Sequence, residues 1–198
     1  TTVEGFALAA AGGILLAVLF NQSRLVEYSL YPYAVILQVT PIVAIAPLII
    51  VYVDNLTIAL LICAWIVAFF PILSNMTLGL RSADHNLVDL FRLHGASRWQ
   101  VLWRLRLPAA LPFLLSGMQV SGGLALIGTV MAEFTAGTGT ATGLAWRISE
   151  AMNRLQISKA FAALALLAVL GIAIFLALSA LEHLLLRRWH ESAIAREQ

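Results

Sequence analysis

The chain has 198 residues, of which 61% are hydrophobic and 11% are charged, and its formal net charge at pH 7 is +2. Because soluble domains carry roughly 25% charged residues, this composition excludes an ordinary soluble protein and predicts an integral membrane protein. The single cysteine, Cys63, excludes a disulfide framework and a cysteine-based metal site.

Five apolar segments predict membrane-spanning helices, each of which needs about 20 mostly apolar residues. In chain order they are Phe6–Phe20 (extending to about Val3), Leu30–Val53, Leu56–Leu80, Ala109–Phe134 and Ser158–Leu186. Prolines interrupt the second and third segments, at positions 32, 41, 47 and 71. Backbone groups that a proline leaves unpaired must be covered at membrane depth, so we expect these two segments to face other helices or a cavity. The prediction is an all-α membrane fold in one domain, residues 1–198.

The basic residues are divided unequally between the two sides of this arrangement. Nine arginines fall on one side, in the first loop (Arg24), in the connector 81–108 and in the tail 187–198. Only Arg147, Arg154 and Lys159 fall on the other side. Because cytoplasmic loops carry an excess of Lys and Arg, we expect the connector and the tail to be cytoplasmic. The N-terminus is then outside and begins with Thr1 rather than Met, so we expect a sixth, preceding helix in the full chain.

Small residues recur every four positions in the fourth segment, at Gly117, Ser121 and Ala125, followed by Gly128 and Thr129. This spacing allows two helices to approach closely. The partner helix could lie within this chain or in a second membrane subunit. The loop after this segment, "AGTGTATGLAWRISEAMNRLQ", predicts an extracytoplasmic lid or surface helix.

The connector predicts a short helix of about eight residues. Asn86 is placed to cap it, and Asp89 favours its positive N-terminal end. Gly95 is typical of a left-handed helix stop. Its apolar residues occupy much of the circumference: Leu87, Val88, Leu90, Phe91 and Leu93. Such a helix favours a groove in another protein over a simple headgroup contact.

A second connector helix is predicted from Ser97 onward, because Ser97 and Gln100 form a capping-box pattern. We expect Trp99, Leu102 and Trp103 to share one side of it, and Pro108 to end it. Its arginines and tryptophans also fit an interfacial helix anchored among lipid headgroups. Composition alone favours that second interpretation.

The chain shows no pattern for chemistry of its own. It lacks the G-x-x-x-x-G-K-[ST] phosphate-binding loop, and its only lysine is Lys159. The histidines do not have metal-ligand spacing: His85, His94, His183 and His190. The hydroxyls in apolar helices have no paired histidine, so they predict helix packing: Ser116, Ser121 and Ser179.

A few polar residues inside the spans are candidates for a translocation path. The neutral ones are Gln38, Thr40, Asn75, Gln119 and Thr129. Taken alone, each of them favours hydrogen bonding between helices over lining a path. Glu133, near the outer end of the fourth span, either pairs with an outer-loop arginine or lines the path.

At the connector the sequence resembles a known family. Gly95, nine residues, Leu105, one residue and Leu107-Pro108 match the pattern "EAA-x3-G-x9-I-x-L-P" of bacterial ABC-importer permeases. Asp89-Leu90-Phe91 stand where that family has Glu-Ala-Ala. The segments "VTPIVAIAPLIIVYV", "FFPILSNMTLGL", "LHGASRWQVLWRLRLPAALPFLLSGMQVSGGLAL" and "MAEFTAG" are similar to the branch that imports sulfonates, taurine, nitrate and pyrimidine thiamine precursors. The resemblance covers essentially the whole chain.

The resemblance implies a type I importer permease core in the bacterial inner membrane, whose coupling helix docks on a separate ATPase. The implied docking residues are Leu87, Asp89, Leu90, Phe91, Arg92, Leu93, Gly95, Ala96 and Trp99, with Phe91 as the anchor. Asp89 and Arg92 would pair with ATPase groups. ATP and magnesium would bind the ATPase, and this chain would bind no cofactor or metal.

The implied partners are two ATPase copies, a second permease (the same chain or another), an extracytoplasmic binding protein and membrane lipid, but no nucleic acid. The implied cargo is a small polar solute, either a small organic or inorganic anion such as a sulfonate or a pyrimidine-type vitamin precursor. An ion-coupled secondary transporter or channel subunit is the alternative, although such proteins place more ionisable residues at mid-membrane than this chain offers beyond Glu133. An intramembrane enzyme would need a nucleophile pair or a metal pattern.

Overall fold

The computed structural model describes residues 1–136 and 143–186, and every regular element in these ranges is a helix. The predicted tail 187–198, with His190, and the Gly/Thr-rich residues 137–142 lie outside the described residues. The elements are α1 (Thr2–Gln22), α2 (Arg24–Val39), α3 (Ile42–Tyr52), α4 (Leu56–Arg81), α5 (His85–Leu93), α6 (Arg98–Val101), the π-helical turn η1 (Leu102–Arg106), α7 (Leu107–Thr135), α8 (Leu144–Asn153) and α9 (Ile157–Leu186).

Four of the five predicted spans are single helices long and apolar enough to cross a membrane. They are α1, α4, the run Arg98–Thr135 that ends in α7, and α9. The second predicted span, Leu30–Val53, is instead the pair α2 and α3, bent by 100°. The bend falls at Thr40 and Pro41, whose backbones are extended, because the proline ring disfavours a helical conformation in the preceding residue. Pro32 and Pro47 lie inside α2 and α3 without ending them.

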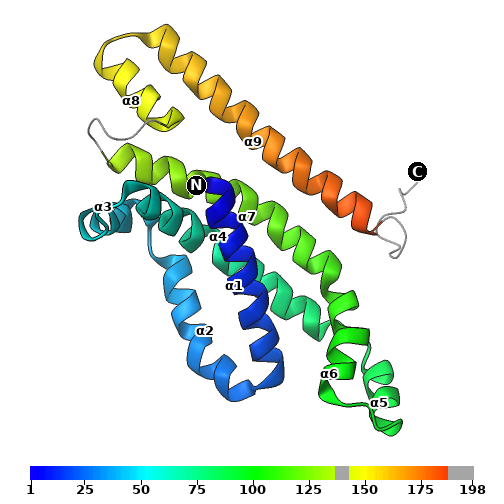
Figure 1. Cartoon of the computed structure of the whole chain (residues 1–198). Coiled ribbons are helices and arrows are strands. Elements are labelled where there is room, and N and C mark those ends of the chain that lie inside the picture. Colours follow the sequence, from blue (N-terminus) through cyan, green and yellow to red (C-terminus); the bar gives the residue numbers. More distant parts are fainter. Residues whose placement is uncertain (137–142, 187–198) are drawn as a thin grey trace.

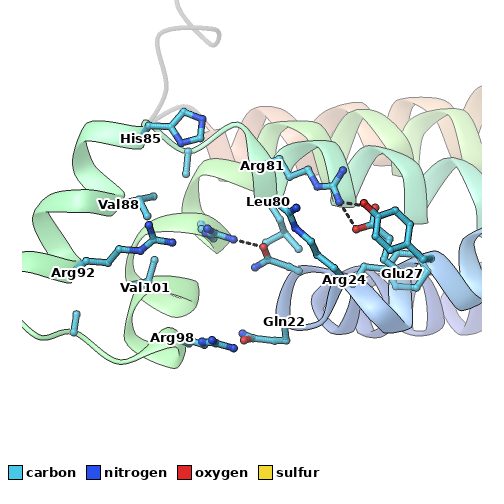
Figure 2. Close-up of a pocket in the computed structure, with 16 residues that line it drawn as sticks. Gln22, Arg24, Glu27, Leu80, Arg81, His85, Val88, Arg92, Arg98 and Val101 are labelled. Carbon is cyan, nitrogen blue, oxygen red and sulfur yellow. Dashed lines mark hydrogen bonds and ion pairs between the residues drawn. The ribbon is translucent and has the colours of Figure 1, made fainter.

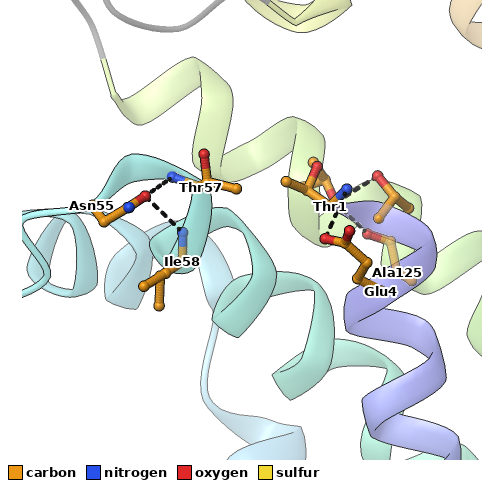
Figure 3. A network of polar contacts seen from close by, with 8 residues as sticks. Thr1, Glu4, Asn55, Thr57, Ile58 and Ala125 are labelled. Atoms are coloured by element: carbon orange, nitrogen blue, oxygen red, sulfur yellow. Dashed lines mark hydrogen bonds and ion pairs between the residues drawn. The ribbon is translucent and has the colours of Figure 1, made fainter.

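α4 is the centre of the molecule and packs between α1 and α7 (Figure 1). Its inner side carries large, fully buried side chains that form the main core with Phe20 of α1: Ile72, Leu73, Met76 and Leu80. Asn55 caps its N-terminus by accepting hydrogen bonds from the amides of Thr57 and Ile58, at 2.9 and 3.3 Å (Figure 3). α4 is therefore fixed both by packing and by its cap.

The small residues of α7 pack within the chain, against α4. A Cβ added at Gly117 would lie 2.8 Å from the Cβ of Asn75, and one added at Gly128 would lie 2.7 Å from the carbonyl oxygen of Cys63. Ser121 lies between them and donates a hydrogen bond of 2.8 Å to the carbonyl of Ala68. Of the two partners left open by the sequence, the structure selects the helix of the same chain.

The two ends of the molecule carry different elements. α5, α6 and the junction of α1 and α2 lie at one end, and α3 and α8 lie at the opposite end (Figure 1). The connector arginines and Arg24 belong to the first end, whereas Arg147, Arg154 and Lys159 belong to α8 and the start of α9. The fold thus separates the two sets of basic residues along the spanning direction. We name the first end, with the connector, the basic end.

Candidate functional site

α5 begins two residues earlier than the sequence predicts. The side chain of Asp84, not Asn86, is the cap, and its Oδ1 accepts a hydrogen bond of 2.9 Å from the Asn86 amide. The prediction of Asn86 as cap is therefore wrong, because its own amide is one of the free donors that a cap must satisfy. The carboxylate of Asp84 also suits the positive end of the helix.

Gly95 ends α5 as the sequence predicts. Its φ is +71°, in the left-handed region that favours glycine, and no atom lies within 4 Å of where a Cβ would be. The Ala96 amide donates to the carbonyl of Phe91 at 3.0 Å, and the Gly95 amide donates to the carbonyl of Arg92 at 3.0 Å. Backbone conformation, not space, therefore requires the glycine.

The second connector helix starts as predicted and then differs. Ser97 and Gln100 form the expected capping box, with hydrogen bonds of 2.8 and 3.3 Å. The chain then continues through the π-helical turn η1 into α7, so the predicted end at Pro108 is wrong. Pro108 lies in the first turn of α7, where a missing N–H is tolerated.

The prediction that Trp99, Leu102 and Trp103 share one side of this helix is also wrong in part. Leu102 is 1% exposed and belongs to the main core, whereas Trp103 is 67% exposed and Trp99 is exposed as well. Leu102 and Trp103 are consecutive residues, which lie about 100° apart around a helix, so one can point into the core while the other stays on the surface. The two tryptophans therefore remain on the surface while Leu102 points inward.

α5 has an inner and an outer apolar side. Val88 is buried with Ala83 and Val101, and Phe91 packs partly buried against this small cluster, as does Ala96. The outer residues Leu87, Leu90 and Leu93 are exposed, Leu90 by 47% and Leu93 by 86%. Phe91, expected as the docking anchor, thus belongs to the inner side.

The polar residues of α5 contact each other. Asp89 and Arg92 are both exposed and form an ion pair of 3.4 Å one helical turn apart. Gly95 and Trp99, also among the expected docking residues, are exposed at the end of the same connector. We call Leu87, Leu90 and Leu93 together the outer face of α5.

The candidate path residues are spread over several contacts. Thr129 is buried, donates to the carbonyl of Ala125 at 3.0 Å and accepts from the Thr2 hydroxyl at 2.9 Å (Figure 3). Asn75 donates to the carbonyl of Pro71 at 2.8 Å. Thr129 thus joins α1 to α7, whereas the hydrogen bond of Asn75 stays within α4.

The remaining neutral candidates lie apart from these. Gln119 of α7 donates to Oε2 of Glu182 in α9 at 2.5 Å. Thr40 donates to the carbonyl of Ile36 at the bend, and Gln38 is exposed. Sequence reasoning missed Glu182, although an acidic residue within an apolar helix was a signal that could have found it.

Glu133 contacts a backbone amide and not an outer-loop arginine, which was one of its two expected roles. Its Oε2 accepts a hydrogen bond of 3.1 Å from the Ala145 amide, in the first turn of α8. The outer-loop arginines Arg147 and Arg154 pair with Glu150, at 3.6 and 3.0 Å. A carboxylate at a helix N-terminus satisfies a free donor and the helix dipole together, so Glu133 ties the end of α7 to α8.

A cleft of about 850 Å³ lies at the basic end, between the junction of α1 and α2, the end of α4, and α5 with α6 (Figure 2). Five arginines line it: Arg24, Arg81, Arg92, Arg98 and Arg106. Arg81 forms an ion pair with Glu27, and Arg106 donates a hydrogen bond to Asn21. Sequence reasoning did not bring Arg24 to the connector, because its place there depends on the packing of α1 against α4.

Comparison with known proteins assigns most of the chain to one family. Residues 9–191 match the family described as "Binding-protein-dependent transport system inner membrane component". The chain is 32% identical over 182 residues to a formylaminopyrimidine transport permease protein of Halalkalibacterium halodurans, which covers 92% of this chain and 72% of that relative.

Two further relatives show the same pattern. A riboflavin transport system permease protein of Chloroflexus aurantiacus is 36% identical, with 85% of this chain and 62% of the relative covered. A putative aliphatic sulfonates transport permease protein of Bacillus subtilis is 32% identical, with 84% and 59% covered. The chain therefore spans about three fifths to three quarters of the length of these relatives.

Proposed function

Since this chain belongs to the family of binding-protein-dependent transport system inner membrane components, we propose that it is the permease subunit of an ATP-driven importer. In this role the membrane helices α1, α4, α7 and α9, with the bent pair α2 and α3, form the translocation path through the bacterial inner membrane. ATP and magnesium bind a separate ATPase subunit, which this chain contacts through α5. The long apolar helices of the structure support the membrane location.

The observation that carries the ATPase contact is the outer face of α5. Leu87, Leu90 and Leu93 are exposed on a helix that is capped at Asp84 and stopped at Gly95. An amphipathic helix with an exposed apolar side is suited to a groove in a partner. Because Val88 and Phe91 hold the inner side, the outer face is available for docking without unpacking the connector.

The connection of α5 to the membrane supports a mechanical role. The helical run Arg98–Thr135 extends from the connector to the far end of α7 without an interruption. A displacement of α5 by the ATPase would therefore be transmitted along α7 to the opposite end. In the proposed assembly two ATPase copies act on two permeases, and the second permease is either the same chain or another.

The solute is proposed from the relatives. Their names refer to formylaminopyrimidine, riboflavin and aliphatic sulfonates. We infer a small polar solute, either an organic or inorganic anion such as a sulfonate or a pyrimidine-type vitamin precursor, delivered by an extracytoplasmic binding protein. The candidate path residues remain Gln38, Thr40, Asn75, Gln119, Thr129 and Glu133.

Docking is tested by charge insertion on the outer face. Leu93→Asp should abolish co-purification of the ATPase in mild detergent, because it places a carboxylate where an apolar contact is needed. Leu93 is 86% exposed, so the variant should fold normally. Leu155→Asp is the matched control, since Leu155 is 85% exposed but follows α8 at the opposite end.

Retained ATPase association in Leu93→Asp would count against docking through α5. If the protein is instead an ion-coupled carrier or channel, the alternative function, no ATPase should co-purify even with the unmodified protein. The path is tested separately: Gln119→Asn and Glu133→Gln should lower solute uptake while ATPase co-purification stays unchanged. Unchanged uptake would remove both residues from the path.

A further inference from the structure

The cleft at the basic end gathers arginines from elements that are far apart in the sequence. Arg24 begins α2, Arg81 ends α4, Arg92 lies in α5, Arg98 begins α6 and Arg106 ends η1. Figure 2 shows Arg92 and Arg98 extending from the connector toward Gln22 and Arg24 at the junction of α1 and α2. The proposed coupling role uses the outer face of α5 and leaves this cleft without a function.

The charges in the cleft are strongly unbalanced. Its lining contains five arginines and a single carboxylate, Glu27, which gives five minus one, or a formal charge of +4. Asp89 lies outside the lining but forms an ion pair with Arg92, which reduces the formal charge to +3. A concave surface of one sign focuses its field and concentrates counter-ions. The cleft is therefore suited to an anion.

Two of the five arginines are available for a ligand. Arg81 is paired with Glu27, Arg92 with Asp89, and Arg106 with Asn21. Within residues 1–136 and 143–186, Arg24 and Arg98 have no ion-pair partner, and they approach the cleft from opposite walls. A planar guanidinium binds phosphate oxygens in bidentate geometry, so both arginines are suited to a phosphate ligand in the cleft.

The position of the cleft indicates where the phosphate comes from. Its walls are the last turn of α1, with Phe20 and Asn21, and the last residues of α4, with Leu80. Tyr28 also lines it and is exposed, and tyrosines are enriched at the level of lipid headgroups. Basic pockets between spanning helices on the cytoplasmic side take anionic headgroups. A volume of about 850 Å³ is large enough for a headgroup.

We propose that this cleft binds the phosphate group of an anionic phospholipid from the cytoplasmic leaflet, held between Arg24 and Arg98. The bound headgroup bridges the junction of α1 and α2 to the connector, and so stabilises the position of the connector against the membrane helices. The proposal uses the cytoplasmic orientation of the basic end but does not depend on docking by the outer face of α5.

The test measures lipid binding by the full-length protein, purified in mild detergent with its associated subunits. Phosphatidylglycerol and phosphatidylcholine are titrated in parallel and bound lipid is counted by native mass spectrometry. Each arginine near an anionic headgroup contributes roughly a fivefold factor in affinity. Arg24→Gln combined with Arg98→Gln should therefore weaken phosphatidylglycerol binding about 25-fold, and should weaken phosphatidylcholine binding less, because the choline cation offsets the charge of its phosphate.

Two variants serve as controls. Arg104→Gln removes an exposed arginine of η1 that does not line the cleft, and should leave lipid binding unchanged. Arg24→Lys combined with Arg98→Lys keeps the charge but not the bidentate geometry, so it should retain part of the affinity lost in the glutamine variant, which separates a charge effect from misfolding. An equal loss in Arg104→Gln, or no loss in the glutamine variant, would overturn the proposal.

The remaining measurements identify the source of the bound anion. Millimolar inorganic phosphate should not displace phosphatidylglycerol, because the acyl chains add contacts with the surrounding helices. Full displacement would show a site for free phosphate and overturn the lipid assignment. If the glutamine variant loses ATPase association but keeps its phosphatidylglycerol affinity, the cleft binds an acidic protein segment and the proposal fails. This outcome differs from a failure of the proposed function, which Leu93→Asp tests.

Discussion

α4 and α9 are both long apolar helices that lie along α7, yet their surroundings differ. More than half of the side chains of α4 are buried, whereas in α9 the buried residues are Ala160, Ala163 and Leu186. The difference follows from α7, which turns its small residues Gly117, Ser121 and Gly128 toward α4. Toward α9 it presents Gly122 and the polar Gln119. Hydropathy alone therefore does not tell a core helix from a peripheral one.

The largest expected effect comes from filling the close approach between α7 and α4. Gly128→Leu would place a side chain against the carbonyl oxygen of Cys63. Even a Cβ added at Gly128 would lie only 2.7 Å from this oxygen. We expect a loss of about 3 kcal/mol in the free energy of unfolding, measured by thermal or SDS titration in detergent micelles. Gly123→Leu on the same helix is the control, because nothing lies within 4 Å of its Cβ position. Similar losses in both variants would remove the contrast between the two sides of α7.

The second prediction compares the same residue type in the two helices. Ile72 of α4 is fully buried and Ile172 of α9 is 59% exposed. Ile72→Ala should lower the free energy of unfolding by about 2 kcal/mol through the cavity that it leaves, and Ile172→Ala by less than about 0.5 kcal/mol. Both are measured in the same titration. A larger cost at Ile172 would show that α9 is covered by a tightly packed partner under the conditions of the measurement.

The third prediction concerns α8, which joins the α7 end to α9. Glu133→Ala removes the acceptor of the Ala145 amide, and loss of such a cap costs about 1 kcal/mol. Amide hydrogen exchange in the first turn of α8 should therefore become faster by roughly five- to tenfold. Glu133→Gln keeps an acceptor oxygen and should change exchange much less. Equal exchange in all three proteins would mean that α8 is held by its packing on α9.

The smallest expected effect is the hydrogen bond between α7 and α9. Gln119→Ala, Glu182→Ala and the double variant form a cycle whose coupling energy isolates this bond of 2.5 Å. Hydrogen bonds between membrane helices average about 0.6 kcal/mol, so we expect a coupling of that size. A coupling near zero would leave packing through Gly122 as the main contact between α7 and α9.

Much of the fold follows from local sequence signals. The helices α1, α4, α7 and α9 begin and end within a few residues of the predicted spans, because a long apolar run has few alternatives to a helix in a membrane. Gly95 and the capping box of Ser97 are confirmed because they depend on residues only a few positions apart. The family is confirmed by the match to residues 9–191.

The features that sequence reasoning missed depend on packing or on non-standard geometry. The inward side of Phe91 depends on Ala83 and Val101, and the position of Arg24 depends on the packing of α1. The bend at Pro41 could be located from the proline, but its angle of 100° could not. The docking of α5 and the path residues stay predictions, since both concern molecules that bind the chain.

The π-helical turn at Leu102–Arg106 determines how the connector is rotated relative to α7. Such a turn is equivalent to one extra residue inserted in an α-helix, and each α-helical residue advances the chain by about 100° and 1.5 Å. Deleting one residue of this turn would therefore rotate α5 and α6 by about 100° about the axis of α7. A single residue in this turn thus sets the direction in which the whole connector faces around the axis of α7. This direction includes that of the outer face of α5 and of the arginines of the cleft.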